Sequence, residues 1–311
     1  MFYEYALIPD IFNLSNYSSP DIFRHCLSPL KEVLLDYAVV RDMNNGDWSE
    51  YVNNNLTRWH PIAKELLNKI NSQNRLRRIN DFSGNHPADD FTWASKAVDS
   101  HQIENLDGII ISHQNAASFS ENPLFSDVER LPNSTFWRQR SSSRRINKNM
   151  QDYLLCMHLI LLCSNSLIFI DPHIDPSKNQ YSHFADIFNY IASRPYKPVI
   201  EVHRVGWYSK DRHGGPIWED NAAWESTFRR RWESLLQSIN VQVKVFIWND
   251  FHDRYLISDL AGISVPYGFD TSNQNITTTW SRLSRADRDD VQREFDPASG
   301  MHTLRHRFTI N

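Results

Sequence analysis

The sequence predicts an α/β protein with a mixed, largely parallel sheet flanked by helices, preceded by a mostly helical N-terminal region. From about residue 150 onward, short apolar runs alternate with segments of helical periodicity, a pattern typical of parallel sheets. Residues 1–140 contain mainly helical patterns and only two strand-like runs. Hydrophobic residues make up 41% of the 311 residues, which indicates a folded chain. We therefore expect a helical region of unknown role over 1–140 and an α/β domain over 141–311.

The N-terminal region begins with MFYEYALIPDIF, which predicts a short strand. Ser28 and Pro29 predict the start of a helix, because proline is favourable at the first helical position. Further elements are expected as helices over 48–56, 61–70 and 90–101, a loop over 79–90, a strand from Gly108 to Ile111 and a connector over 115–143.

In the C-terminal half, expected helices and expected strands alternate along the chain. The expected order is a helix over 146–161, a strand over 167–170, a helix over 181–192, a strand over 198–205, a helix over 218–239 and a strand over 241–248. A hairpin over 246–270, a helix over 286–295 and a strand over 303–310 follow. Asp171 and His173 come directly after a strand, where open α/β sheets bind ligands, although an Asp-Pro turn is an equal alternative.

Charge and cysteine content limit the class of protein. The net charge of −4 gives no general electrostatic reason to bind nucleic acid, although local basic clusters are compatible with phosphate contacts. Three cysteines without metal-ligand spacing favour a reducing, cytoplasmic location. No membrane span is expected, because polar residues interrupt the most apolar run, 154–170. We expect neither a metal nor a cofactor.

The segment FIWNDFHDRYLISD, residues 246–259, places charged residues inside an apolar hairpin. In a continuous strand, His252 and Arg254 would lie on the same face. The cation would disfavour protonation of the imidazole, which leaves the ring able to act as a nucleophile or base. An ordinary hairpin with locally satisfied polar groups is the structural alternative.

His252, Arg254 and Asp259 resemble the His-x-Lys-x4-Asp motif of the phospholipase D superfamily, with arginine in the lysine position. The family usually continues with a Gly-Ser-x-Asn turn, whereas this hairpin ends in Gly268-Phe269-Asp270. The order of elements over residues 150–311 is also similar to one half of that fold.

The resemblance implies metal-independent phosphodiester chemistry through a phosphohistidine. One histidine attacks phosphorus, a second protonates the leaving group, and the cations hold phosphate oxygens. Such a site needs two copies of the motif, and none of the other twelve histidines is the first residue of a His-x-Lys or His-x-Arg motif. The resemblance therefore implies a homodimer with one shared site. His252, Arg254 and Asp259 are the expected catalytic residues.

Four further residues are candidates for substrate binding. They are Asp270 at the end of the hairpin, Glu201 and His203 on one strand face, and Arg282 in an arginine series at 282, 285 and 288. A core histidine is the alternative for His203, and a solvated helix face is the alternative for Arg282. The basic run 138–148 is either a solvated loop or a phosphate-contacting edge.

Two classes of function remain open. The first is a dimeric phosphodiesterase, and specifically a nuclease, because soluble single-motif relatives in bacteria often cut DNA or RNA. The second is a catalytically silent module for dimerisation or partner binding, with a partner protein docking on the N-terminal region. A similar His-Asp-Arg motif occurs in the domain that follows some microtubule-interacting-and-transport modules. A role in bacterial phage defence fits either class.

Overall fold

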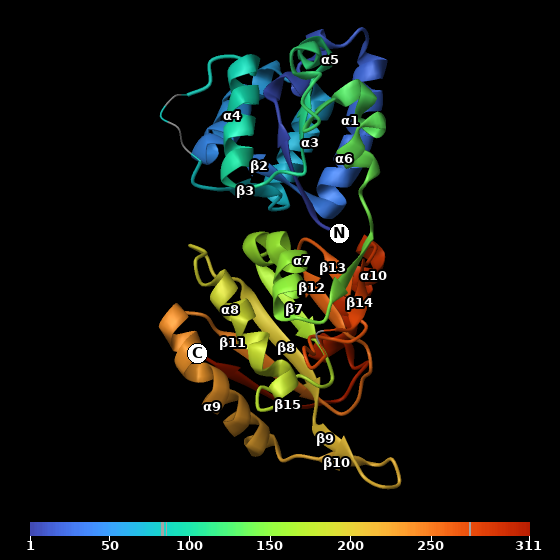
Figure 1. Ribbon diagram of the computed structural model, residues 1–311. Helices are drawn as coiled ribbons and strands as arrows, with labels where there is room; N and C mark the ends of the chain where they lie inside the picture. The colour runs from blue at the N-terminus through green and yellow to red at the C-terminus, as the bar shows by residue number, and fades with distance from the viewer. Residues whose placement is uncertain (82–83, 85, 274) are drawn as a thin grey trace. The chain divides into compact units, whose positions relative to one another are not determined.

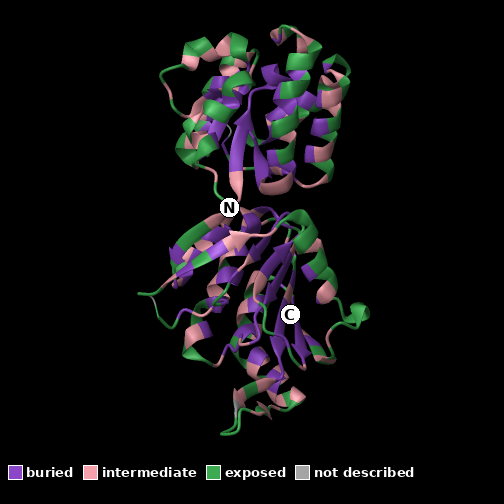
Figure 2. Ribbon diagram, turned by 90° about the vertical axis from the view of Figure 1, so that its right-hand side faces the viewer, coloured by how far each residue is buried: buried purple, intermediate pink, exposed green. Residues whose placement is uncertain are grey.

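The structure is a computed structural model that describes residues 1–81, 84, 86–273 and 275–311. The chain divides into two compact units, which are Phe2–Ser141 (the N-terminal unit) and Ser142–Asn311 together with Met1 (the C-terminal unit). Part of the loop expected over 79–90 lies outside the described residues. In both units the strands are mostly buried, and exposed residues lie on the outer faces of the helices (Figure 2).

The N-terminal unit is built on a five-stranded parallel sheet, with strand order β3-β2-β1-β4-β5 (Figure 1). The strands are β1 (Tyr3–Leu7), β2 (Ala38–Asp42), β3 (Leu76–Arg78), β4 (Gly108–Ile111) and β5 (Phe125–Asp127). Strands β1 and β4 confirm the two predicted runs. The expectation of a mostly helical region missed β2, β3 and β5, because these strands are short and each contains arginine or aspartate. The connector expected over 115–143 is also wrong, since it contains β5 and belongs to this unit.

Six α-helices lie in the described part of the N-terminal unit. They are α1 (Pro20–Tyr37), α2 (Asp47–Asn54), α3 (Pro61–Ser72), α4 (Asp90–Ile103), α5 (His113–Ala116) and α6 (Thr135–Arg138). Helix α1 begins earlier than predicted, because the Ser19 side chain accepts the Ile22 N–H and Pro20 takes the first turn. Helices α1 and α3 pack together, whereas α4 reaches the sheet through Ser100, which accepts a hydrogen bond from Arg41 of β2.

The C-terminal unit contains an eight-stranded mixed sheet, with strand order β15-β11-β8-β7-β12-β13-β14-β6. The strands are β6 (Ser143–Asn147), β7 (Ser166–Ile170), β8 (Val199–Val205), β11 (Val243–Trp248), β12 (Tyr255–Ser258), β13 (Gly262–Ser264), β14 (Thr277–Arg282) and β15 (Leu304–Ile310). Among the described strands of this eight-stranded sheet, only the β7–β8 and β8–β11 pairs are parallel. The sheet is therefore mixed, as expected, but it is not largely parallel. The reason is that the hairpins and the terminal strand, unlike the helical crossovers, reverse the chain direction.

Helices cover both faces of this sheet. They are α7 (Met150–Cys163), α8 (Asp186–Ile191), α9 (Asn221–Ile239) and α10 (Arg285–Glu294), and the 3-10 helix η7 (Asn179–Ala185) leads into α8. On one face, Trp232 of α9 packs on Phe184 and Phe188. On the other face, Val291 of α10 and Phe295 join a cluster with Trp248 and Ile257. A short hairpin, β9 (Trp207–Lys210) and β10 (Pro216–Trp218), follows β8.

The carboxyl ends of β7, β8 and β11 lie at one edge of the C-terminal sheet, because these strands are parallel. The loop 249–254 leaves β11 there and leads into β12, which pairs antiparallel with β7. This carboxyl edge therefore brings together the segments that follow β7 and β11 and precede β12. Across the described part of the chain, no helix combines the length and the apolar character needed to span a bilayer.

Candidate functional site

Asp171 is the buried centre of the carboxyl edge. It follows β7 directly and has no exposed surface. Its Oδ1 accepts the His173 N–H at 2.9 Å, and its Oδ2 accepts the Phe269 N–H at 3.0 Å and the Tyr181 hydroxyl at 3.1 Å. Burial raises the pKa of Asp171, although these hydrogen bonds and the charge of Arg254 oppose the rise. The carboxyl group thus ties the end of β7 to the turn after β13.

Arg254 lies against Asp171 and connects three segments of the chain. Its Nε is 3.7 Å from Asp171 Oδ1. Its Nη1 donates to the carbonyl oxygen of His252 at 3.3 Å and to that of Pro266 at 3.4 Å. The side chain is 26% exposed, so part of the guanidinium still faces solvent. Arg254 therefore has a structural role at this edge and retains surface for an anion.

Asp270 lies beside this cluster and pairs with Lys148. The Lys148 Nζ is 3.2 Å from Asp270 Oδ2, and the Ser272 N–H donates to Asp270 Oδ1 at 2.6 Å. Burial raises the pKa of Asp270, but the hydrogen bonds from Ser272 and Lys148 outweigh burial and leave that pKa below its ordinary value. Lys148 is also 5.0 Å from the centre of the Tyr267 ring. Asp270 is therefore an ionised partner of a buried lysine.

His252 belongs to the loop 249–254 and not to a strand, since β12 begins at Tyr255. The prediction that His252 and Arg254 share one face of a strand is therefore wrong, because side-chain alternation does not apply to this loop. The His252 side chain is 77% exposed, and its Nε2 is 3.8 Å from Asp250 Oδ1. The imidazole is open to solvent at the carboxyl edge.

His252 lines a pocket of about 460 Å³. The other lining residues include Trp207 and Trp218 of the β9–β10 hairpin, Asn249, Asp250 and Arg305 of β15. The Arg305 guanidinium lies 4.2 Å from the centre of the Trp218 ring. In the part of the chain that the structure describes, Arg254 does not line this pocket. The pocket thus combines an imidazole, an arginine and two indole rings.

Asp259 lies at the other end of β12. Its Oδ1 accepts the N–H groups of Asn165 at 2.9 Å and Ser166 at 3.3 Å, at the start of β7. A strand advances about 3.4 Å per residue, so the five steps from Arg254 to Asp259 span about 17 Å. The structure therefore does not bring Asp259 together with His252 and Arg254, and Asp259 anchors the pairing of β7 with β12.

His203 and Glu201 lie on β8, on the face covered by Phe295. His203 is 1% exposed and stacks against Phe246 and Trp248. Its Nδ1 accepts the Trp248 indole N–H at 3.0 Å, which places the ring proton on Nε2, 3.5 Å from Glu201 Oε2. Burial lowers the pKa of His203. The structure therefore assigns His203 to the core, the alternative left open by the sequence, and removes it from the substrate-binding set.

Arg282 ends β14 opposite Ile263 of β13, and its Nη1 donates to the Met1 carbonyl oxygen at 3.3 Å. Ile263 pairs with Leu256, so Arg282 lies level with Leu256 but two strands away from β12, with its side chain bound to Met1. The structure does not bring Arg282 to the carboxyl edge.

Four residues of the site were missed in the sequence. Lys148 was noted only as part of the basic run 138–148, and its burial beside Asp270 distinguishes it from the run. Trp207 and Trp218 lie about 45 and 34 residues before His252, and Arg305 lies about 53 residues after it, so no local pattern connects them. Among the described residues, no group of three or more His, Cys, Asp or Glu side chains is placed to hold a metal ion.

Comparisons with known proteins give no family for this chain. No family model and no curated protein matches the sequence. A solved structure of TrmBL2, an archaeal chromatin protein with a novel mode of DNA binding, is 10% identical, with a TM-score of 0.29 over 79% of this chain and 83% of that chain. A likeness at this TM-score carries no argument about fold or function.

Proposed function

We propose that the C-terminal unit is a metal-independent phosphodiesterase of the phospholipase D type that acts on nucleic acid as a homodimer. The observation that carries the proposal is an exposed imidazole, His252, in a pocket that also contains a guanidinium, Arg305. Arg254 and the buried Asp171 lie at the same carboxyl edge. The motif His252-Asp253-Arg254 and the order of elements from β7 to β13 support the same class.

The proposed reaction has two steps. An imidazole nitrogen of His252 attacks phosphorus, the P–N bond forms, and the P–O bond to the leaving group breaks. The His252 of a second copy gives its proton to the leaving oxygen. Water then attacks the phosphohistidine: a new P–O bond forms, the P–N bond breaks and frees the first imidazole, and the same second imidazole accepts a proton from that water. Each chain supplies a single motif, so the site requires two copies.

Arginines stabilise the phosphate in this proposal. The exposed part of Arg254 and the guanidinium of Arg305 offer parallel N–H donors to phosphate oxygens. Arginine keeps its charge at any physiological pH, so it serves as a fixed cation where the usual motif has lysine.

The indole rings favour a nucleic acid over other phosphodiesters. Trp207 and Trp218 line the pocket beside His252, and single-stranded nucleic acids bind by stacking bases on aromatic side chains beside cations. An unpaired base next to the scissile phosphate is therefore the substrate feature that this pocket fits best.

One observation favours a second candidate, a catalytically silent module for dimerisation or partner binding. Arg254 is held by Asp171 and by two carbonyl oxygens, and it does not line the pocket of His252 among the described residues. A guanidinium used in this way stabilises the hairpin without chemistry. In this candidate the N-terminal unit supplies the surface for a partner protein.

The first experiment measures cleavage of fluorescent single-stranded DNA and RNA, and of bis(p-nitrophenyl) phosphate, by the full-length protein in excess EDTA. We expect cleavage in EDTA, a covalent phosphoprotein that is acid-labile, and a loss of at least about 1,000-fold in His252→Ala, because the nucleophile is removed. The matched control is His183→Ala, another exposed histidine of the same unit with its own acidic neighbour, Asp186. It should keep full activity.

Two results would reject the phosphodiesterase. One is activity that EDTA abolishes, and the other is equal activity in the His252→Ala and wild-type proteins. Inactivity of the wild type towards every substrate, with an unchanged oligomeric state in His252→Ala, would favour the silent module.

A further inference from the structure

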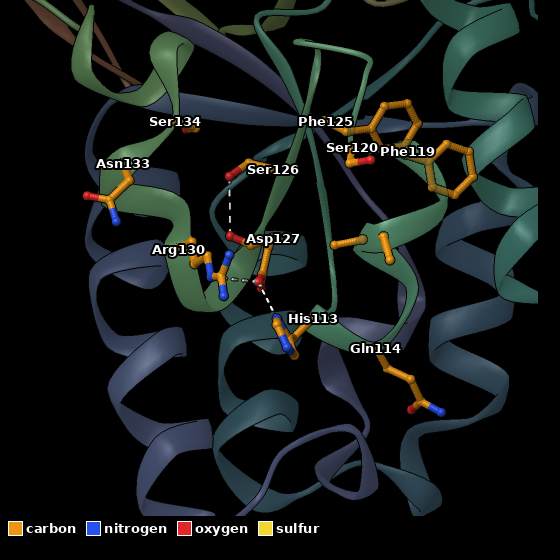
Figure 3. A pocket seen from close by; sticks show the side chains of 12 residues that line it. His113, Gln114, Phe119, Ser120, Phe125, Ser126, Asp127, Arg130, Asn133 and Ser134 are labelled. Atoms are coloured by element: carbon orange, nitrogen blue, oxygen red, sulfur yellow. Dashed lines mark hydrogen bonds and ion pairs between the residues drawn. The ribbon is translucent and has the colours of Figure 1, made fainter.

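The N-terminal unit contains a pocket of about 600 Å³ that the proposed phosphodiesterase does not use (Figure 3). Its size lies in the range of small-molecule sites. The pocket runs along the edge strand β5, from Phe125 to Asp127, and its His113 end lies at the carboxyl ends of β4 and β5, since Asp127 is the last residue of β5 and His113 follows β4 after Ser112. Open parallel sheets bind ligands at this edge, close to the point where the strand order reverses. Here the order reverses between β1 and β4.

Three charged side chains gather on one wall of the pocket, and Figure 3 shows them pointing toward one another. His113 Nδ1 is 2.6 Å from Asp127 Oδ2, and Arg130 Nε is 4.0 Å from the same oxygen. The hydrogen bond to Asp127, and then the charge of that carboxylate, raise the pKa of His113. The imidazole of His113, whose protonated form this carboxylate favours, and the guanidinium of Arg130 thus share Asp127. Glu129 also adds to the rise, whereas Arg130 opposes it.

Both cations keep surface for a ligand. The His113 side chain is 53% exposed and the Arg130 side chain is 73% exposed, whereas Asp127 is 10% exposed. The bond from Nδ1 to Asp127 orients the ring, so that Nε2 is available to donate outward. A protonated imidazole and a guanidinium that converge on one pocket favour an anion with several oxygen acceptors, such as a phosphate.

An aromatic wall lies on the other side of the pocket. The rings of Phe119 and Phe125 are stacked, with centroids 4.4 Å apart and planes 13° apart. Figure 3 shows them together, away from His113. Ser126, Asn133 and Ser134 add hydroxyl and amide groups to the lining of the pocket. A planar heterocycle fits the aromatic wall, and the polar groups fit a sugar.

The segment that carries His113 is firmly attached to the sheet. Asp10, which follows β1 and is 3% exposed, accepts hydrogen bonds from the Ser112 hydroxyl at 2.6 Å and from the Asn115 amide at 2.8 Å. Burial raises the pKa of Asp10 to about 6. This anchor on both sides of His113 holds the imidazole near Asp127 before any ligand binds, which reduces the ordering cost of binding.

We propose that this pocket binds a mononucleotide, with its phosphate at His113 and Arg130 and its base against Phe119 and Phe125. The site is separate from the carboxyl edge of the C-terminal unit. It therefore does not depend on phosphodiesterase activity.

Isothermal titration calorimetry of the full-length protein at pH 6.5 tests the proposal with four probes: the 5′-monophosphates of adenosine, guanosine, cytidine and uridine. The four matching nucleosides and inorganic phosphate are the partial probes. We expect one nucleotide to bind at least about tenfold more tightly than inorganic phosphate and than its own nucleoside, because only the nucleotide reaches both walls. Equal affinity for inorganic phosphate would show an anion site only and would overturn the nucleotide assignment. Undetectable binding of all probes at 5 mM would overturn the site.

Variants locate the bound nucleotide. His113→Ala and Arg130→Ala should each weaken nucleotide binding about tenfold or more, because each removes a charge-assisted hydrogen bond to the phosphate. Phe119→Leu, which keeps an apolar side chain, should weaken the binding of the nucleotide but not the binding of inorganic phosphate. The matched control is Arg24→Ala on α1, an exposed arginine that also faces an aspartate three residues away. An equal loss in Arg24→Ala, or no loss in Arg130→Ala, would contradict the location.

The pH dependence separates binding by His113 from a structural effect. Affinity should be highest below the raised pKa of His113 and should fall as the pH rises through that pKa, because the imidazole loses its positive charge. Asp127→Asn removes the main cause of the raised pKa, so the midpoint of this fall should move to lower pH. An unchanged midpoint in Asp127→Asn, in a variant with a wild-type circular dichroism spectrum, would reject the role of the pair.

Discussion

At Gly268 the backbone conformation and the surrounding atoms both exclude a side chain. Its φ is +61°, and an added Cβ would lie 1.9 Å from Asp171 Oδ2 and 3.1 Å from Arg254 Cδ. The glycine lets the turn after β13 approach Asp171, so that the next residue, Phe269, donates its N–H to that carboxyl group. The contact between Arg254 and Asp171 thus depends on a residue that makes no side-chain contact itself.

We predict that Gly268→Ala lowers the free energy of unfolding by about 3 kcal/mol or more, because left-handed strain and overpacking add. Gly300→Ala is the matched control, since Gly300 has φ +68° and no atom within 4 Å of the added Cβ. Gly300→Ala should lower the free energy of unfolding by about 1 kcal/mol, which is the cost of the left-handed backbone strain alone. Urea denaturation measures both. An equal loss of unfolding free energy in the two variants would show that the backbone at Gly268 does not lie as close to Asp171 as the structure has it.

Individual residues also show the limit of local patterns. The spacing of His252 and Arg254 is a property of the sequence, but their shared strand face was inferred from a strand that begins only at Tyr255. The pattern of His203 allowed either a ligand-binding or a core histidine. Only the tertiary packing of Phe246, Trp248 and Phe295 around the ring decides in favour of the core.

At the scale of elements, a buried ion network joins the first three strands of the N-terminal sheet. Glu4 of β1 is 1% exposed, and its carboxylate accepts hydrogen bonds from Arg41 of β2 at 2.5 Å and from Arg77 of β3 at 2.6 Å. Arg77 also pairs with Glu104 after α4. This network explains how strands with charged residues lie inside the unit, and why their sequences did not predict strands.

We predict that Glu4→Gln lowers the free energy of unfolding by about 3 kcal/mol or more, because two buried guanidinium groups lose their shared counter-charge. Glu65→Gln is the control. Glu65 is a surface carboxylate that also faces two cations, Lys31 and Lys69, and its loss should change stability little because water screens the pairs. Chemical denaturation followed by circular dichroism compares them. A Glu4→Gln protein as stable as Glu65→Gln would contradict a role of the buried network in holding the strands.

Elements with a strong local signal were predicted well. Helices α2, α3 and α10 and strands β4, β7, β8 and β11 lie within a few residues of their expected positions, because periodicity and capping are local properties. The start of α1 was displaced because two Ser-Pro pairs, at 19–20 and at 28–29, compete for the same role, and α1 continues through Pro29. Local chemistry alone did not choose between them.

At the scale of the whole molecule, each unit has its own core. The N-terminal core contains Tyr5, Trp48 and Trp93, and one of the cores of the C-terminal unit contains Trp248 and Phe295. We therefore expect the units to lose structure in separate transitions. Hydrogen exchange measured by mass spectrometry at increasing urea concentration follows the unfolding transitions of both units.

In this experiment Glu4→Gln should lower the urea midpoint of peptides from residues 2–141 only, and Gly268→Ala that of peptides from 142–311 only. A single transition that both variants shift equally would show that the chain unfolds as one cooperative unit.

The sequence by itself determined the α/β class and most of the helices and strands with clear periodicity. These features depend on neighbouring residues, so a linear pattern is sufficient to predict them. Only the tertiary structure decided the parallel sheet of the N-terminal unit, the mixed pairing of the C-terminal sheet, and the two pockets. Strand pairing joins residues tens of positions apart, and the pocket of His252 needs Trp218 of the β9–β10 hairpin to meet Arg305 of β15. Such contacts depend on the packing of the whole chain, which no local spacing contains.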